Sequence, residues 1–94
     1  MNHKERMLAG LPYKAWMDGL PEEQMENKKR IHEYNLCPPY QTEKIDRLIR
    51  AILGKAGKNI SFLAPFHCDY GKNIEVGNNF YANYNCIILD VGLV

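Results

Sequence analysis

A repeat of six residues in the second half of the chain constrains the fold more than any other feature. From Ile60 to Ile88, apolar side chains occupy nearly every even-numbered position, an alternation typical of strands. Two series also recur at a step of six, Phe62, Cys68, Ile74, Phe80, Cys86 and Ala64, Tyr70, Val76, Ala82, Ile88. A parallel β-helix with three short faces per turn advances six residues per face, so each series is expected to stack inward as a ladder. Regular hairpins in a β-sandwich fragment produce a similar alternation, so the period favours a β-helix and leaves that alternative open.

The residues before this repeat follow a helical pattern. Three helices are expected, from His3 to Ala9, from Pro21 to Tyr34 and from Thr42 to Leu53. The third is the clearest, because its apolar residues recur at steps of three and four and form one stripe: Ile45, Leu48, Ile49, Ile52 and Leu53. We expect Thr42 to cap its N-terminus. The change of pattern near Gly54 predicts an α+β chain, with a helical part at residues 1–56 and a coil of strands at residues 57–94.

Size, charge and cysteine content exclude several classes of protein. A chain of 94 residues is one domain at most, and its 12 basic and 11 acidic side chains lack the excess of Lys and Arg that phosphate contacts need, so we expect no nucleic-acid partner. There is no run of about 18 apolar residues and no apolar signal-peptide segment, so we expect no membrane insertion and a cytoplasmic location. The cysteines Cys37, Cys68 and Cys86 lack a Cys-x-x-Cys spacing, which favours free thiols over disulfides or a metal site.

Two stretches of the sequence resemble the maltose and galactoside O-acetyltransferases. The stretch from Pro65 to Asp90, with its Asp-Tyr-Gly and Asn-Phe-Tyr-Ala-Asn-Tyr-Asn motifs, is similar to the first coils of that family. The segment from Lys4 to Gly10 is similar to the start of the family's helical domain. The resemblance implies an N-terminal α-helical cap of the maltose acetyltransferase type, followed by the first coils of a left-handed parallel β-helix. It also implies a trimeric enzyme that transfers the acetyl group of acetyl-CoA to a hydroxyl of a sugar such as maltose or glucose, with acceptor sites between neighbouring subunits.

By their positions in these motifs, four residues resemble the acceptor side of the family's site. Asn83 matches a catalytic asparagine that contacts the acceptor and steadies the transition state, and an amide is chemically suited to both tasks. Asp69 and Tyr81 match a polar and an aromatic acceptor contact. Asp90 matches an acidic position, although Val91 stands where some members carry a second acid. Structural roles stay open beside these: turn stacking for Asn83, packing for Tyr81 and solvation for Asp69.

The implied reaction needs a base that these residues do not supply. A sugar hydroxyl is a poor nucleophile at neutral pH, so its attack on a thioester requires a general base, normally a histidine. In the family that histidine and the acetyl-CoA groove belong to later coils, and His3, His32 and His67 do not occupy its place. We therefore expect the acceptor-side, N-terminal part of an O-acetyltransferase, inactive alone and without cofactor-binding or metal-binding residues. The alternative is a non-catalytic β-helix module that assembles with itself or with a full-length relative.

Overall fold

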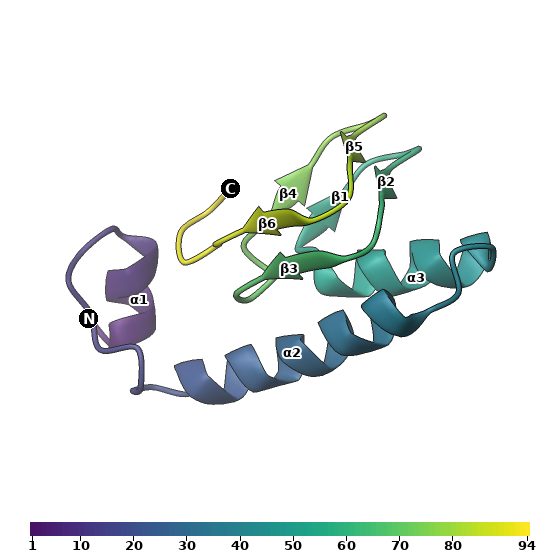
Figure 1. Ribbon diagram of the computed structural model, residues 1–94. Helices are drawn as coiled ribbons and strands as arrows, with labels where there is room; N and C mark the ends of the chain where they lie inside the picture. The colour runs from purple at the N-terminus through teal and green to yellow at the C-terminus, as the bar shows by residue number, and fades with distance from the viewer.

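The computed structural model describes residues 1–94 and contains three helices and six short strands. The elements are α1 (His3–Leu8), α2 (Leu20–Leu36), α3 (Thr42–Ile52), β1 (Lys55–Ala56), β2 (Ser61–Phe62), β3 (Phe66–Cys68), β4 (Glu75–Val76), β5 (Tyr81–Ala82) and β6 (Cys86–Ile88). Figure 1 shows α2 and α3 lying along one side of the strands, with α1 beside the start of α2. The α+β organisation expected from the sequence is confirmed. None of the helices has both the length and the apolar character needed to cross a membrane.

The three helices lie where the sequence predicts them, with small shifts at their ends. Helix α2 begins one residue before Pro21, directly after Gly19, whose φ of 76° places it in the left-handed region. The predicted cap of α3 is wrong: Thr42 is already the first helical residue, Gln41 precedes it, and no side chain caps this end. The chain turns into the helix one residue early, because the backbone N–H of Gln41 donates to the carbonyl of Pro38.

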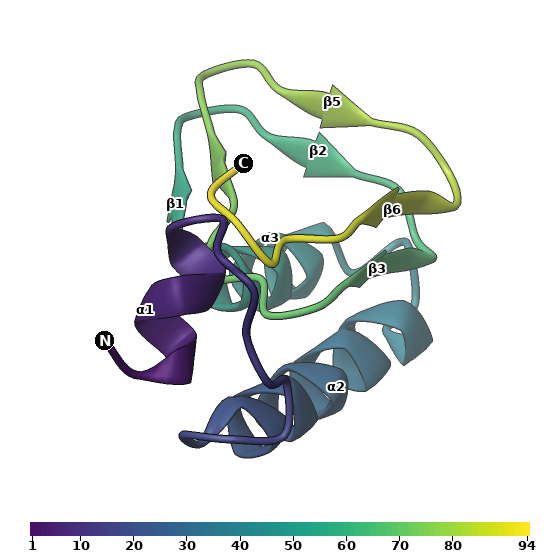
Figure 2. The ribbon, with the colours of Figure 1, turned by 90° about the vertical axis from the view of Figure 1, so that its left-hand side faces the viewer.

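The six strands form three parallel pairs. Strand β1 pairs with β4, β2 with β5 and β3 with β6. In Figure 2 the three pairs form the sides of a triangle, and the chain passes around that triangle twice. Strand β1 lies within residues 1–56, so the segment that the sequence assigns to the helical part also contributes the first strand of the coil.

Residues that stack on one another lie twenty positions apart, which corrects the expected ladders. Phe62 lies opposite Ala82, although these two residues belong to different six-residue series. Strand-to-strand steps of six lead from Ala56 to Phe62 and on to Cys68, but the next strand brings Val76 into the equivalent place eight residues later. Two of the three corners therefore follow the predicted period, and the third is two residues longer.

We call the longer corner, residues 69–74 between β3 and β4, the long corner. It contains the Asp-Tyr-Gly motif. Its last residue, Ile74, is 1% exposed and belongs to the core, although it lies outside the strands. Because Ile74 points inward at a step of six from Cys68, the sequence pattern alone does not distinguish this corner from another strand.

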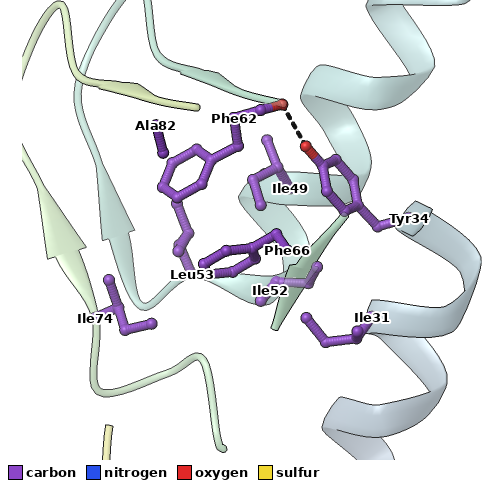
Figure 3. Packing of buried hydrophobic residues seen from close by; sticks show 9 residues of the cluster. All are labelled: Ile31, Tyr34, Ile49, Ile52, Leu53, Phe62, Phe66, Ile74 and Ala82. Carbon is purple, nitrogen blue, oxygen red and sulfur yellow. Dashed lines mark hydrogen bonds between the residues drawn. The ribbon is translucent and has the colours of Figure 1, made fainter. Parts of the chain in front are cut away.

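The hydrophobic core joins the helices to the coil (Figure 3). Its nine buried members come from α2, from α3 and the residue after it, and from the strands and the long corner: Ile31, Tyr34, Ile49, Ile52, Leu53, Phe62, Phe66, Ile74 and Ala82. The hydroxyl of Tyr34 in α2 donates a hydrogen bond to the carbonyl of Phe62 in β2. The helical part and the coil therefore share one core.

Candidate functional site

The long corner depends on a glycine. Gly71 has a φ of 76°, a backbone conformation that residues with a Cβ rarely adopt. A Cβ at this position would collide with the backbone carbonyl of Ile52 and would lie 2.9 Å from Oδ1 of Asn27. The glycine of the Asp-Tyr-Gly motif thus lets the corner pack directly against the middle of α2 and the C-terminal end of α3.

Tyr70, the middle residue of the motif, anchors the corner to the N-terminal helices. Its ring is 5% exposed and packs with Met7 of α1 and Leu20 of α2 in a second small apolar cluster. The amide of Gln24 in α2 donates to its hydroxyl at 3.1 Å. Tyr70 therefore ties the backbone of the long corner to α1 and α2.

Asp90 closes the long corner from inside. Its side chain is fully buried, and one carboxylate oxygen accepts the backbone N–H groups of Asp69 and Tyr70, both at 2.9 Å. The other oxygen accepts the N–H of Asn73 at 3.3 Å, and the side chain of Asn73 donates to the carbonyl of Asp90 at 2.8 Å. Both oxygens are therefore engaged in holding the corner. A direct contact between Asp90 and an acceptor stays a prediction, and this geometry favours a structural role instead.

Asp69 has a different environment from Asp90. Its side chain is only partly buried, and its carboxylate forms no hydrogen bond within the chain, whereas its backbone N–H is bound by Asp90. Burial raises the pKa of this carboxyl, and the nearby charge of Asp90 raises it further. Asp69 thus has a held backbone and a carboxylate whose acceptor oxygens are available.

Asn27 of α2 also belongs to this region, and the sequence analysis missed it. It is fully buried, and its Nδ2 donates to the carbonyls of Cys68 at 3.2 Å and Asp69 at 3.1 Å. The available signal was its spacing, because Asn27 precedes Ile31 and Tyr34 by four and seven residues and so shares their apolar face. A polar residue on such a face requires a buried partner, here the coil.

Tyr81 lies on β5, and Asn83 lies at the corner between β5 and β6. Tyr81 is 60% exposed on β5, and Asn83 follows that strand as an exposed residue. Oδ1 of Asn83 accepts the backbone N–H of Tyr84 at 2.8 Å, and its Nδ2 donates no hydrogen bond within the chain. The asparagines with positive φ that form tight turns are Asn59, Asn79 and Asn85, so Asn83 itself is not required by the turn geometry.

The four predicted site residues therefore form two separate groups in one chain. Asp69 and Asp90 lie at one end of the β3–β6 side of the triangle, and Tyr81 and Asn83 lie at the other end (Figure 2). Leu63 is the neighbour of Asn83 in the first turn, and strand β3 lies between Leu63 and Asp69. In a single chain, the β3–β6 pair therefore separates the two groups.

Two pockets lie outside these groups. A pocket of about 610 Å³ lies between α3 and β2, with Ile45, Ile49 and Phe62 in its walls and Tyr84 at one side. A second, of about 250 Å³, lies between the N-terminal helices and the long corner, and its lining includes Arg30 and three glutamates. None of the four predicted site residues lines either pocket. No cluster of His, Cys, Asp or Glu side chains is arranged to hold a metal ion.

Comparison with known proteins places this geometry in a family. The family description "Maltose acetyltransferase hexapeptide capping motif" matches residues 6–57, more than half of the chain. The crystal structure of a maltose O-acetyltransferase from Clostridium difficile 630 superposes with a TM-score of 0.95 at 41% identity, over 98% of this chain and 49% of that one. A structure of galactoside acetyltransferase in complex with coenzyme A gives a TM-score of 0.90 at 37% identity, over 96% of this chain and 45% of that one.

A curated relative agrees with the structural matches. The galactoside O-acetyltransferase of Escherichia coli is 37% identical over 86 residues, which cover 92% of this chain and 42% of that protein. The chain spans about half the length of the curated relatives that it matches. The capping motif, the two-turn arrangement of strands and these similarities agree, and the chain belongs to the maltose and galactoside O-acetyltransferase family of hexapeptide-repeat proteins.

Proposed function

We propose that these residues are the N-terminal, acceptor-side part of an acetyl-CoA-dependent sugar O-acetyltransferase that acts on a mono- or disaccharide such as maltose or glucose. The observation that carries the proposal is the match of backbone and sequence to a maltose O-acetyltransferase over 98% of the chain. In this proposal residues 1–56 form a helical cap, and residues 57–94 form the first coils of a left-handed parallel β-helix. The parallel strand pairs and their triangular arrangement support that architecture.

Each proposed site residue has a chemical task that its environment allows. The Asp69 carboxylate accepts hydrogen bonds from sugar hydroxyls, because no group within the chain competes for its oxygens. The exposed ring of Tyr81 packs against a sugar face. The free Nδ2 of Asn83 donates to the oxygen that becomes negatively charged in the transition state. Asp90 supports the site through the backbone of the long corner.

The proposed site is completed by a second copy of the chain. Because Asp69 and Asn83 lie at opposite ends of one side of the triangle, we place a sugar site that uses both groups between subunits. This separation supports the homotrimer, with sites between neighbouring subunits, that the family resemblance implies. The three unpaired cysteines support a reducing, cytoplasmic location.

Acetyl-CoA is proposed as the co-substrate of the complete enzyme, where it supplies the activated acetyl group. The two pockets described above carry no net positive charge that would bind the phosphate groups of coenzyme A. The charged side chain lining the larger pocket is Asp46, and in the smaller pocket Glu22, Glu23 and Glu26 are balanced by three basic side chains, Lys4, Arg30 and Lys72. We therefore assign no residue of this chain to the cofactor. By the family resemblance, none of His3, His32 and His67 occupies the place of the general base, so we expect the 94 residues alone to be inactive.

The direct test is an acetyl-transfer assay on the longest product of the reading frame that contains these residues. Release of free thiol from acetyl-CoA is measured with maltose, glucose and galactosides as acceptors. We expect sugar-dependent release, and we expect Asn83→Ala to lower kcat/KM by about 100-fold to 1,000-fold, as loss of an oxyanion donor does. The matched control is Asn78→Ala, an exposed corner asparagine whose Oδ1 likewise accepts a backbone N–H, from Lys58 at 2.8 Å. Equal loss in both variants, or no sugar-dependent release, contradicts the proposal.

The second candidate is a non-catalytic module that assembles with itself or with a full-length relative. It is favoured by the exposed apolar side chains of the second turn, including Ile87 at 63% and Leu89 at 68% exposure. The same assay separates the two candidates. A module is supported if the product transfers no acetyl group but forms stable oligomers, and it is excluded if Asn83-dependent transfer is measured.

A further inference from the structure

The backbone of Asp69 is held at both of its polar groups by buried side chains. Its N–H donates to Oδ1 of Asp90 at 2.9 Å, and its carbonyl accepts from Nδ2 of Asn27 at 3.1 Å. Both of these side chains are fully buried. Asp90 belongs to the coil, whereas Asn27 belongs to α2, so the two parts of the chain hold Asp69 from opposite sides.

We propose that Asn27 is a positioning residue for the acceptor site, because its amide ties α2 to the backbone of Asp69 and so fixes where the Asp69 carboxylate lies. This inference rests on the proposed function, in which Asp69 contacts the sugar. Asn27 touches neither the acceptor nor the reacting atoms, and its effect is exerted through Asp69.

The packing of α2 leaves the Asn27 amide little freedom to adjust. Ile31 and Tyr34 lie on the same face of the helix and are buried in the shared core, which sets the height and rotation of α2 against the coil. On the opposite side, Oδ1 of Asn27 lies against Gly71, with no space for a Cβ between them. A shift of the amide therefore requires a shift of the helix or of the long corner.

All hydrogen bonds of the Asn27 side chain are donated by its Nδ2 group. Nδ2 reaches the two carbonyls and, at 3.4 Å, the thiol of Cys68. Oδ1 has no hydrogen-bond partner although it is buried, which is unfavourable for stability. An amide at this place is thus a poor choice for packing alone, and the two donated bonds to the backbone of Cys68 and Asp69 account for its presence.

The test compares two asparagines of the same helix. Asn35 is the matched control, because its amide also binds the coil backbone, donating to the carbonyl of Phe66 at 3.0 Å and accepting its N–H at 2.9 Å. Both Asn27→Ala and Asn35→Ala are expected to lower the melting temperature of the longest product of the reading frame. Only Asn27→Ala is expected to raise KM for the sugar, by about tenfold, with KM for acetyl-CoA unchanged.

Coupling to Asp69 is tested by a double-mutant cycle. In an Asp69→Ala background, Asn27→Ala should raise KM for the sugar no further, because both changes remove the same contact. Asn27→Ser keeps one donor and should recover part of the loss, and it replaces the alanine variant if that one does not fold. An equal rise of KM in Asn35→Ala, or full additivity with Asp69→Ala, overturns the proposal.

A second readout does not depend on acetyl transfer. The titration of the Asp69 carboxyl is followed by NMR in the same variants. Burial and Asp90 raise the pKa of this carboxyl, and Asn27→Ala should lower it towards its ordinary value by admitting water to the corner, whereas Asn35→Ala should not. If the titration moves but no sugar is acetylated, the proposed function fails while the placement of Asp69 by Asn27 stands. If sugars are acetylated and neither KM nor the titration responds to Asn27→Ala, only this inference fails.

Discussion

At the residue scale, the two carboxylates that meet at the long corner differ in exposure, because Asp90 is fully buried and Asp69 is only partly buried. The Asp90 carboxylate accepts hydrogen bonds from three backbone N–H groups, one of which is the N–H of Asp69. The Asp69 carboxylate, in contrast, has no hydrogen-bond partner within the chain. Burial also raises the pKa of the Cys68 thiol to about 11, so this cysteine is protonated at neutral pH and has a packing role rather than a nucleophilic one. The chemistry available to a ligand at this corner is therefore that of Asp69.

The raised pKa of Asp69 predicts a pH-dependent effect on stability. A carboxyl whose pKa is higher in the folded chain than in the unfolded chain contributes stability that is fully present below the unfolded pKa, near 3.8, and is lost as pH rises through the folded pKa. Asp69→Asn removes the ionisation, so we expect a higher melting temperature at neutral pH and little change at about pH 3. Thermal unfolding followed by circular dichroism at both pH values measures this.

The control for this prediction is Asp46→Asn. The Asp46 carboxylate is paired with Arg50 at 2.8 Å, so its neutralisation should not raise the melting temperature at neutral pH. A lower melting temperature of Asp69→Asn at neutral pH is the opposite of the expected result and excludes a destabilising Asp69 charge.

At the element scale, the helices and the alternation of the strands could be predicted, but the long corner could not. Helix bounds follow from apolar periodicity and from Gly and Pro, which act locally, so they agree within a few residues. The long corner could not be predicted because Ile74 points into the core just as a strand residue does, and the spacing of apolar residues does not distinguish a corner from a strand. The role of Asn27 was missed for a related reason, since this residue is buried by the coil that packs against α2 rather than by its own helix. The residues Asp69, Tyr81 and Asn83 came from resemblance, and their roles stay predictions.

Because the long corner lies so close to the helices, we expect the addition of one methyl group at Gly71 to lower the stability of the fold strongly. Gly71→Ala combines an unfavourable positive φ with a collision against the backbone of Ile52, and we expect a loss of about 2–4 kcal/mol in the free energy of unfolding. Gly10→Ala is the matched control, because Gly10 has a similar φ of 74° but open space around the added Cβ, and it should cost only about 1 kcal/mol. Urea unfolding measures the loss in the free energy of unfolding of each variant. If the two variants lose the same amount, the prediction is wrong, because the structure then relaxes around the added methyl group at residue 71.

At the scale of the whole molecule, the shared core makes the helical part and the coil one unit. Ile31 and Tyr34 of α2 and the buried residues of α3 belong to the same cluster as Phe62 and Phe66 of the coil, and α2 and α3 also pack against each other. The division into residues 1–56 and 57–94 therefore describes two patterns of sequence, whereas the packing energy is common to both.

The exposed apolar residues of β6 and the position after it predict self-association of the 94-residue chain. Ile87 and Leu89 lie two positions apart, so they point to the same side of the strand, away from the core. We expect Ile87→Lys with Leu89→Lys to shift the chain towards monomer, measured by sedimentation velocity. Leu36→Lys is the control, because Leu36 is equally exposed, at 69%, but lies at the end of α2. If the control has the same effect, the association is non-specific.

The two additional residues of the long corner have a consequence for insertions and deletions. A turn of eighteen residues would follow from three steps of six, but the corner is enclosed by Ile52 and Asn27 of the helices on one side and by Asp90 of the coil on the other. Removing two residues to restore the regular step would therefore withdraw the chain from both helices at once. We expect the length of this corner to be inherited together with the helical cap, so that proteins that carry this cap keep the same number of residues between β3 and β4 even where other corners vary.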